Sequence, residues 1–367
     1  MRAEDEGLGP NRRHVLVAGG AFCAVSGLGS VVEGSNPMKL HVPPEEATHQ
    51  RSFMQWPVNR RVHPDPVFLQ MLQQTIADIA NVIAEFEPIV MLAANEHHRS
   101  ARRLLSDRVE LWDVATEDLW CRDSGPLFAI NKEGGLVVSH IQFNGWGGKQ
   151  VHRHDGRIAA ELAARLSLPM IASDLKGEAG GVEHDGHGLL MAHESSWVND
   201  NRNAGLSRSE IEGRLLSAYG AERMIWSPGV WGEDITDYHI DSLARFTGPG
   251  RVLINLPDRP DLQDPFHVAA LETHDALEAA GLEIEVIPEP EKRRVKSHDF
   301  VASYANYYVG NGGVVAAQFG DSVADEIAIA ALKRHYPGRE IVMLNVDPLG
   351  EVGGGIHCAT QQMPAVD

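Results

Sequence analysis

The stretch DPVFLQMLQQTIADIANVIAEFEPIVMLA, residues 65–93, indicates the fold class. Its apolar residues recur at helical spacing as far as Phe86, and Asp65 followed by Pro66 is typical of a helix start. The apolar run at 89–93 follows directly and predicts a buried strand. A helix that leads into a short apolar strand is a unit of α/β proteins.

The same helix-then-strand unit returns along the chain. Its further copies are 155–165 before 170–172, 207–219 before 223–226, 264–280 before 283–287, and 321–335 before 340–344. Within them Ser207 and Glu210 fit a capping box, and Gly220 and Gly281 stand where helices commonly end. Short apolar stretches between the units predict additional strands. These stretches are 136–141, 188–192, 251–256 and 314–318.

The helices begin roughly 50 to 60 residues apart, which favours one supersecondary module used several times. The pattern predicts an α/β protein made of modules of two or three strands and a helix. An open doubly wound sheet would show the same alternation and is left as an alternative. No Pro- or Ser-rich linker divides the body, so residues 46–367 are expected to form a single domain.

Composition limits the kinds of partner. The chain has 51 acidic and 32 basic residues and a formal charge of −19. Nucleic-acid affinity depends on clustered Lys and Arg, so a phosphate-backbone partner is not expected. A small cationic molecule suits this field better, although net acidity also serves solubility. The cysteines, Cys23, Cys121 and Cys358, are too few and too far apart for a disulfide framework or a closed zinc site.

The N-terminus has the layout of an export signal. Arg12 and Arg13 precede a weakly apolar, Gly- and Ala-rich run at 15–32, as in a twin-arginine leader. We therefore expect residues 1–45 to be a leader and the protein to be periplasmic or secreted, with a cytoplasmic protein as the alternative. No later segment has the ~20 apolar residues that cross a bilayer, so the mature form is not expected to enter a membrane.

Residues 117–126 contain groups that suit a planar cation. Asp118 and Asp123 stand on either side of Trp120 in the sequence. A guanidinium donates in a fork to carboxylates and stacks on aromatic rings. The alternative is a turn in which Arg122 pairs with carboxylates of its own segment.

A histidine stands among aspartates at residues 236–241. In an extended segment, residues two apart face the same side, so Asp237, His239 and Asp241 are predicted to point into one pocket. Nearby carboxylates favour charged histidine, which suits a proton donor near neutral pH. A surface cluster of Asp and His is the alternative.

The nucleophile candidate is Cys358, which follows three glycines at 353–355. Consecutive glycines are costly in conformational entropy, so the backbone there is expected to turn sharply or approach another group closely. A thiol beyond such a loop is well placed for attack, whereas a buried inert cysteine is the alternative. Glu178 and the turn-rich residues after it indicate by themselves only a hairpin.

Taken together, these segments resemble the agmatine deiminase family of the guanidine-modifying pentein superfamily. The resemblance covers residues 54–364, and eight marker stretches occur in the family order. These stretches are 56–57, 86–88, 118–126, 143–149, 178–188, 201–203, 236–241 and 353–362.

The resemblance implies a five-bladed α/β propeller of strand-strand-helix-strand modules with the active site at its axis. It also implies Cys358 as nucleophile, His239 as general acid/base, Asp123 and Asp241 as guanidinium-binding carboxylates, and Glu178 as a further acid. Trp120 is expected beside the substrate channel, and Asp118 and Asp237 are further candidates for substrate binding.

The implied reaction is hydrolysis of agmatine to N-carbamoylputrescine and ammonia through a covalent amidino-cysteine, as in putrescine synthesis. The resemblance implies no metal and no organic cofactor. Deimination of peptidylarginine or another arginine derivative, amidino transfer to an amine, and non-catalytic binding of a cationic ligand are the alternatives. A homo-oligomer is left open.

The sequence departs from the family pattern near the predicted site. Tyr238 replaces the usual Gly before the catalytic His, Ala204 replaces Pro, Gly355 replaces Asn, and Cys121 replaces Met. Tyr238 is expected to add a large ring close to the pocket. Substrate identity is therefore less firmly indicated than reaction type.

Overall fold

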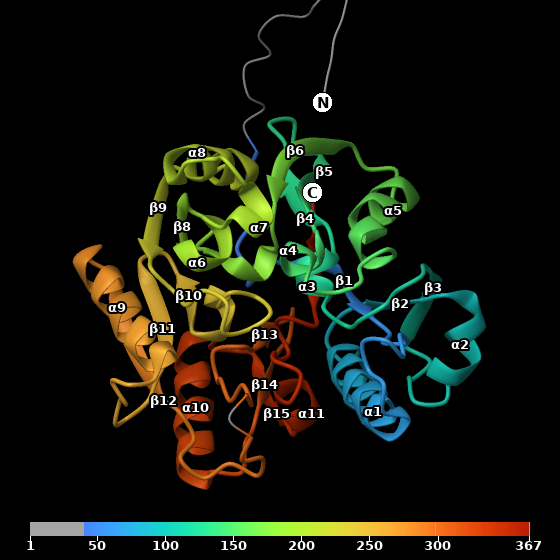
Figure 1. Ribbon diagram of the computed structural model, residues 1–367. Helices are drawn as coiled ribbons and strands as arrows, with labels where there is room; N and C mark the ends of the chain where they lie inside the picture. Colours follow the sequence, from blue (N-terminus) through green and yellow to red (C-terminus); the bar gives the residue numbers. More distant parts are fainter. Residues whose placement is uncertain (1–39, 298, 367) are drawn as a thin grey trace, which may run out of the picture. The chain divides into compact units, whose positions relative to one another are not determined.

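Five small sheets organise the chain in the computed structural model, which describes residues 40–297 and 299–366. The sheets follow one another around a common centre in chain order (Figure 1). The predicted leader spans residues 1–45, and its residues 1–39, which include the twin arginines, lie outside the described residues.

Each module repeats one connection. Two strands pair antiparallel, and a helix then leads to a third strand that runs parallel to the second. The first module comprises β1 (His49–Gln55), α1 (Pro66–Ile83), β2 (Ile89–Ala93), α2 (Asn95–Ala101) and β3 (Val109–Asp113). The second comprises β4 (Leu127–Ile130), β5 (Leu136–Gln142), α5 (Ile158–Arg165) and β6 (Met170–Lys176). The third comprises β7 (Val182–His184), β8 (Leu189–His193), α8 (Arg208–Tyr219) and β9 (Arg223–Ser227).

The last two modules have the same order. The fourth comprises β10 (Ala244–Gly248), β11 (Arg251–Leu256), α9 (Pro265–Ala279) and β12 (Glu283–Pro288). The fifth comprises β13 (Tyr308–Val309), β14 (Gly313–Ala317), α10 (Ser322–His335) and β15 (Glu340–Leu344). Short helices in the connections are α3 (Cys121–Ser124), α4 (Gly145–Gly148), α6 (Glu194–Trp197), α7 (Asp200–Asn203) and α11 (Asp347–Gly350). The 3₁₀ turns are η1 (Asp155–Arg157), η2 (Ala179–Gly181) and η3 (Ile240–Ser242).

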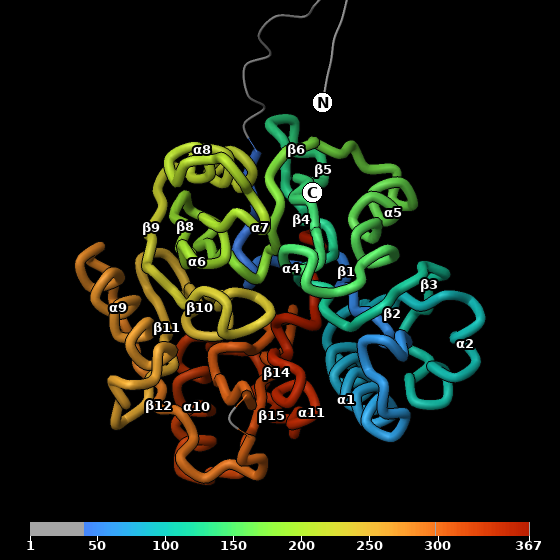
Figure 2. The backbone as a smooth tube through the Cα atoms, viewed as in Figure 1, coloured from blue at the N-terminus to red at the C-terminus, as the bar shows by residue number. Residues whose placement is uncertain are grey.

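The final strand closes the ring. β16 (Gln361–Pro364) pairs antiparallel with β1, so the last residues of the chain complete the first module. The tube in Figure 2 shows the consequence, because the blue α1 lies beside the red α11. Separate three- and four-stranded sheets replace the single sheet of a doubly wound fold. The five-bladed propeller is therefore the architecture, as the resemblance implied.

The sequence predicted the longer elements well. The five predicted helices correspond to α1, η1 with α5, α8, α9 and α10, and the apolar stretches correspond to β5, β8, β11 and β14. Ser207 and Glu210 form the capping box. Several strands were not predicted. These are β1, β3, β4, β7, β10, β13 and β16.

The expected leader boundary at residue 45 was placed too late. Leu40 and Val42 are buried in one hydrophobic cluster with residues of β4 and α8. The His41 N–H donates to the carbonyl of Ile130, and the Val42 N–H donates to that of Tyr219. Residues 40–45 therefore belong to the folded body.

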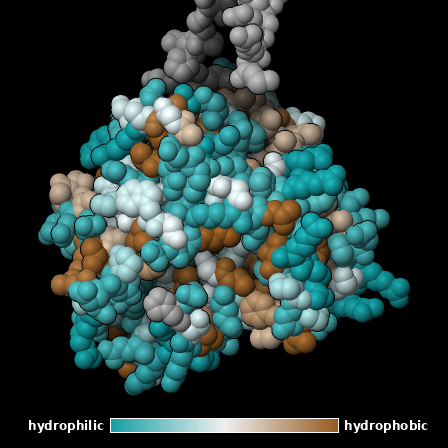
Figure 3. Space-filling view, in the orientation of Figure 1, coloured by the Kyte–Doolittle hydropathy of each residue, from teal (hydrophilic) through white to brown (hydrophobic). Residues whose placement is uncertain are grey.

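On the face shown in Figure 3, the surface of the described residues is largely hydrophilic, with small, separated hydrophobic areas. Across residues 40–297 and 299–366, none of the helices combines the length and apolarity required to traverse a bilayer.

The start of α1 offers a test of the local sequence argument. The Asp65 side chain accepts a hydrogen bond from the Val67 N–H at 2.8 Å and caps the helix. We predict that Asp65→Ala lowers the free energy of unfolding by about 1 kcal/mol, because a first-turn N–H loses its acceptor. Chemical denaturation measures this loss. Asp65→Asn keeps a capping oxygen and should restore stability, so equal losses in both variants would contradict the capping role.

Candidate active site

Gly180 in η2 marks the point where the candidate residues meet. A Cβ built on Gly180 would lie 2.6 Å from Asp123 Oδ1, 2.9 Å from His239 Nδ1 and 3.2 Å from Asp241 Oδ2. These side chains come from α3 and from the turn at η3, which are far apart in the sequence. Only glycine leaves room for them, so the fold brings two carboxylates and one imidazole around a single position.

Cys358 lies beside this group. Its Sγ is 3.5 Å from Asp241 Oδ2, and the residue is 9% exposed. A Cβ built on Gly354 would lie 2.6 Å from the ring of Trp120 and 3.4 Å from Sγ. The sulfur and the indole ring therefore adjoin the same glycine, which places Trp120 next to the candidate nucleophile.

The sulfur and the His239 imidazole have no mutual hydrogen bond in the described part of the chain. The sulfur contacts Asp241, and His239 and Asp241 both adjoin Gly180. An acid that protonates a leaving nitrogen must reach the substrate rather than the nucleophile. The arrangement therefore fits a nucleophile and an acid that act on different atoms of one substrate.

Two carboxylates lie beside the ring nitrogens of His239. Its Nε2 lies 3.3 Å from Glu178 Oε2, and its Nδ1 lies 3.7 Å from Asp123 Oδ1. Burial by itself would lower the pKa of His239, but Asp123 and Glu178 outweigh burial and raise the pKa to about 9. The imidazole is therefore cationic at neutral pH, as a proton donor requires.

Glu178 is fixed by Arg202 in α7. The guanidinium Nε donates to both carboxylate oxygens, at 3.1 and 2.8 Å. Burial would raise the pKa of Glu178, but Arg202 and His239 outweigh it and lower the pKa. Glu178 thus remains an anion that orients the imidazole.

The pKa of Asp123 is shifted in the opposite direction to that of Glu178. Burial raises its pKa to about 6, with Glu178 and Asp241 adding to the rise and His239 opposing it. The Trp146 indole N–H donates to Oδ2 at 2.8 Å, and the Gly180 N–H donates to Oδ1 at 3.2 Å. These donors favour the ionised carboxylate and fix its plane.

Asp241 has one occupied and one free oxygen. Its Oδ2 lies 2.7 Å from His357 Nδ1, whereas its Oδ1 is buried with no hydrogen-bond partner among the described residues. Burial would raise the pKa of Asp241, but His357 outweighs it and the pKa is lowered. A buried anionic oxygen without a donor suits a cationic ligand.

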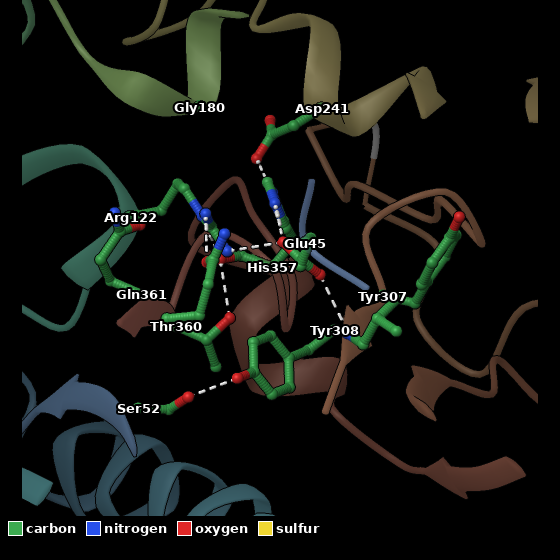
Figure 4. Close-up of polar contacts among 12 residues, drawn as sticks. Glu45, Ser52, Arg122, Gly180, Asp241, Tyr307, Tyr308, His357, Thr360 and Gln361 are labelled. Atoms are coloured by element: carbon green, nitrogen blue, oxygen red, sulfur yellow. Dashed lines mark hydrogen bonds and ion pairs between the residues drawn. The ribbon is translucent and has the colours of Figure 1, made fainter. Parts of the chain in front are cut away.

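His357 connects the site to a buried ionic cluster. Its Nε2 lies 2.9 Å from Glu45 Oε2, and Figure 4 shows the ring between Asp241 and Glu45. Arg122 and Arg245 approach the same Glu45 oxygen at 2.9 and 3.2 Å. The sequence left His357 without a role, and the structure makes it the link between Asp241 and this cluster.

The thiol is disfavoured as an anion in this setting. Burial raises the pKa of Cys358 well above its usual range, and Asp241 and Asp123 raise it further. A cation bound between these acids would counter their effect on the sulfur.

Two predicted substrate-binding residues lie in other networks. Asp237 pairs with Arg202 at 2.7 Å and with Lys149 at 2.8 Å. Asp118 Oδ1 lies 2.8 Å from His63 Nε2, and the Gln150 side chain donates to its Oδ2 at 2.8 Å. Asp118 and Asp237 therefore brace loops around the site, and their binding of substrate stays a prediction.

The predicted extended conformation at 236–241 is wrong. Asp237 and Tyr238 have positive φ, of 59° and 65°, and a 3₁₀ turn follows at η3. His239 and Asp241 converge through this turn rather than through strand alternation. The left-handed backbone at Tyr238 explains why the family usually has Gly there.

Tyr238 does not line the site as expected. Its ring stacks on His193 with centroids 4.6 Å apart and meets Phe266 edge-on at 5.0 Å. The side chain packs against the hydrophobic cluster that the third and fourth modules share. The alternative in which Arg122 pairs within its own segment also fails, because its carboxylate partner is Glu45.

Sequence reasoning missed several residues that position the site. They are Glu45, Trp146, Gly180, Arg202 and Asn306. Trp146, Gly180 and Arg202 belong to the marker stretches, which was a signal for them. Glu45 carried no signal because it fell within the expected leader.

The family model for Porphyromonas-type peptidyl-arginine deiminases matches residues 41–364. This match spans most of the chain. The chain belongs to this family.

Curated relatives agree with the assignment. A protein of Streptomyces coelicolor assigned as an agmatine deiminase is 33% identical over 338 residues, which cover 89% of this chain and 99% of the relative. A Legionella pneumophila protein with the same assignment is 31% identical and covers 89% of this chain and 95% of its own length.

Solved structures show the same architecture. The agmatine deiminase of Enterococcus faecalis matches with a TM-score of 0.81 and 25% identity, over 91% of this chain and 98% of that chain. A Porphyromonas gingivalis protein assigned as an arginine deiminase matches with a TM-score of 0.78 and 26% identity, over 89% of this chain and 98% of that chain.

Arg202 provides a test of the charge balance. We predict that Arg202→Ala lowers the free energy of unfolding by about 3–5 kcal/mol at pH 7, because Glu178 and Asp237 lose their buried partner. The folded-state pKa of Glu178 is lowered, so the lost stabilisation exists above the ordinary glutamate pKa and fades as pH falls. In denaturation curves the deficit should stay constant from pH 7 down to the ordinary glutamate pKa of 4.5 and shrink as the pH falls below that value.

The matched control is Arg259→Ala, which breaks the exposed ion pair with Glu291. That change should leave stability nearly unaltered, since exposed pairs contribute little. A deficit in Arg202→Ala that stays constant below pH 4.5 as well would contradict the assigned charge balance.

Proposed function

We propose that this protein hydrolyses the guanidine group of a small cationic substrate, agmatine above all, to N-carbamoylputrescine and ammonia. The observation that carries the proposal is the convergence of Asp123, His239 and Asp241 on Gly180, with the Cys358 sulfur beside Asp241. The agmatine deiminase assignments of the relatives support the choice of substrate.

Binding positions the substrate for attack. Asp123 and Asp241 accept the planar cation's N–H groups, and the free Oδ1 of Asp241 supplies an unused acceptor. Trp120 provides an apolar wall beside the sulfur. Fixing the guanidinium plane turns an encounter between sulfur and carbon into a positioned reaction.

The cation also activates the nucleophile. Burial, Asp241 and Asp123 hold the thiol protonated in the free protein, since they raise its pKa. A bound guanidinium offsets these carboxylates, so the thiol releases its proton to solvent. The sulfur anion then attacks the central carbon and forms a tetrahedral adduct.

His239 completes both halves of the reaction. The imidazolium protonates the departing nitrogen, the C–N bond breaks, and ammonia leaves an amidino-cysteine. The neutral imidazole then removes a proton from water, which attacks the same carbon. The C–S bond breaks, the ureido product forms, and the sulfur regains a proton from solvent.

Peptidylarginine is the second candidate substrate class, because the matching family model carries that description. The two classes differ at the end remote from the guanidine, where agmatine has an amine and a peptide has a main chain. Export by the predicted leader with Arg12 and Arg13 would favour an extracellular arginine derivative, and we retain export as a proposal from sequence.

The substrate test uses purified protein with agmatine, free arginine and an arginyl peptide at equal concentration. We predict ammonia and ureido product in a one-to-one ratio, with agmatine giving the highest kcat/KM. Cys358→Ser should lower turnover by at least about 1000-fold, because a hydroxyl is a far weaker nucleophile than sulfur here.

Cys121→Ser is the matched control, since Cys121 is a buried thiol outside the described catalytic contacts. It should retain turnover. Wild-type rates in Cys358→Ser, or no ammonia from any of the three guanidines, would refute the proposed reaction.

The pH profile tests the two assigned protonation states. Asp123 must be ionised, with a pKa of about 6, and His239 must be protonated, with a pKa of about 9. The kcat/KM for agmatine should therefore have an acidic limb below about pH 6 and an alkaline limb above about pH 9, and between them it should follow ionisation of the free Cys358 thiol, because this parameter reports groups of the free enzyme.

The variant Trp146→Phe tests whether the acidic limb of the profile reports Asp123. It removes the indole N–H that favours ionised Asp123, so the acidic limb should move to higher pH while the alkaline limb stays in place. A shift of the alkaline limb alone would assign these limbs to other groups.

A further inference from the structure

Asn306 touches the reacting atom from a module that supplies none of the predicted catalytic residues. It lies just before β13, and its side-chain Nδ2 is 3.0 Å from Cys358 Sγ. The residue is 2% exposed. The contact is thus a buried hydrogen bond from a neutral amide to the candidate nucleophile.

We propose that Asn306 is a further catalytic residue, whose amide N–H stabilises the Cys358 sulfur as an anion. The role rests on the proposed function, in which that sulfur attacks the guanidine carbon. Asp241 and Asp123 bind the cation but oppose the sulfur anion. A donor directed at the sulfur offsets part of that opposition without adding a charge that would repel the substrate.

The orientation of the amide is fixed by its other contacts. Asn306 Oδ1 accepts the Cys358 N–H at 3.2 Å, and Nδ2 also approaches the Asp241 carbonyl at 3.3 Å. A flipped amide would set its NH₂ group against the Cys358 N–H and its oxygen against the Asp241 carbonyl and the sulfur. The surrounding backbone therefore selects the rotamer that presents N–H to Sγ.

Gly355 makes the position available. A Cβ built on Gly355 would lie 2.5 Å from Asn306 Oδ1 and 2.9 Å from Asn306 Cβ. The amide thus occupies the space of the missing side chain. Because the family usually has Asn at position 355, this close fit is tied to a departure of this chain from the family pattern.

The experiment measures the thiol directly and does not depend on turnover. The rate of iodoacetamide modification of Cys358 is followed from pH 6 to pH 11 by mass spectrometry of its peptide. In Asn306→Leu, a neutral change that removes the donor, the midpoint should move to higher pH. The rate at pH 8 should fall about tenfold, as expected for loss of a hydrogen bond to a charged group.

A matched control distinguishes the proposed role of Asn306 from a purely structural one. Gly353 has φ of +90° and open space at its Cβ position, so Gly353→Ala strains the same loop without a new contact. That variant should lose stability but keep the wild-type midpoint. An equal midpoint shift in Gly353→Ala and Asn306→Leu would assign the effect to loop geometry and overturn the proposal.

The close contact between Gly355 and the Asn306 side chain allows a second, independent test. Gly355→Ala should displace the amide and shift the midpoint in the same direction as Asn306→Leu. The double variant should be no worse than Asn306→Leu alone, because both changes remove one interaction. Additive shifts would contradict the shared contact.

Two further outcomes keep the test decisive. If Asn306→Leu does not fold, the near-isosteric Asn306→Asp replaces it, and its carboxylate should move the midpoint further upward. A wild-type midpoint in a folded Asn306 variant would refute the proposal. Failure of the proposed function is distinct, since it would appear as absent ammonia release with the midpoint shift intact.

Discussion

Compensation of buried negative charge is the constraint on which this site depends. Asp123, Glu178 and Asp241 are each buried, and an isolated buried carboxylate would become protonated rather than bind a cation. Arg202 and His239 contact Glu178 on one side of the group, and His357 lowers the pKa of Asp241 on the other. The two ring nitrogens of His357 contact Asp241 and Glu45, so the imidazole joins these two carboxylates (Figure 4).

Closure of the propeller by β16 brings the groups of this buried cluster together. Glu45 precedes β1, and His357 and Cys358 precede β16, the strand that pairs with β1. The pairing of the first and last strands therefore places the Glu45 carboxylate against His357. Arg245 in β10 also reaches Glu45, so one buried acid joins distant modules. Loss of the closing strand would break the contact between Glu45 and His357 as well as the first sheet.

The sequence predicted the parts of the fold that rest on long periodic signals. The helix that begins after Asp65 follows from its cap and its apolar stripe, both of which are local. β13 has two residues, Tyr308–Val309, and is defined by pairing with β14, so no local signal could find it. At the site, the residue types indicated the chemistry, but Asp237 was misplaced because its pairing with Arg202 depends on a left-handed turn. Tertiary charge pairs and positive φ values are properties of the folded chain, which is why the resemblance was needed to assign roles.

In the proposed reaction, the same acids have opposite effects on the substrate and on the nucleophile, and this opposition favours the forward reaction. Asp123 and Asp241 attract a guanidinium, yet they raise the pKa of the Cys358 thiol. We therefore expect the sulfur to be reactive mainly while a cation is bound. The ureido group that replaces the guanidinium is neutral and no longer offsets the carboxylates, so the thiolate regains its proton and this end of the product loses its electrostatic attraction to Asp123 and Asp241. Conversion of a charged group into a neutral one thus weakens product binding and disarms the nucleophile in one step, which favours release over the reverse attack.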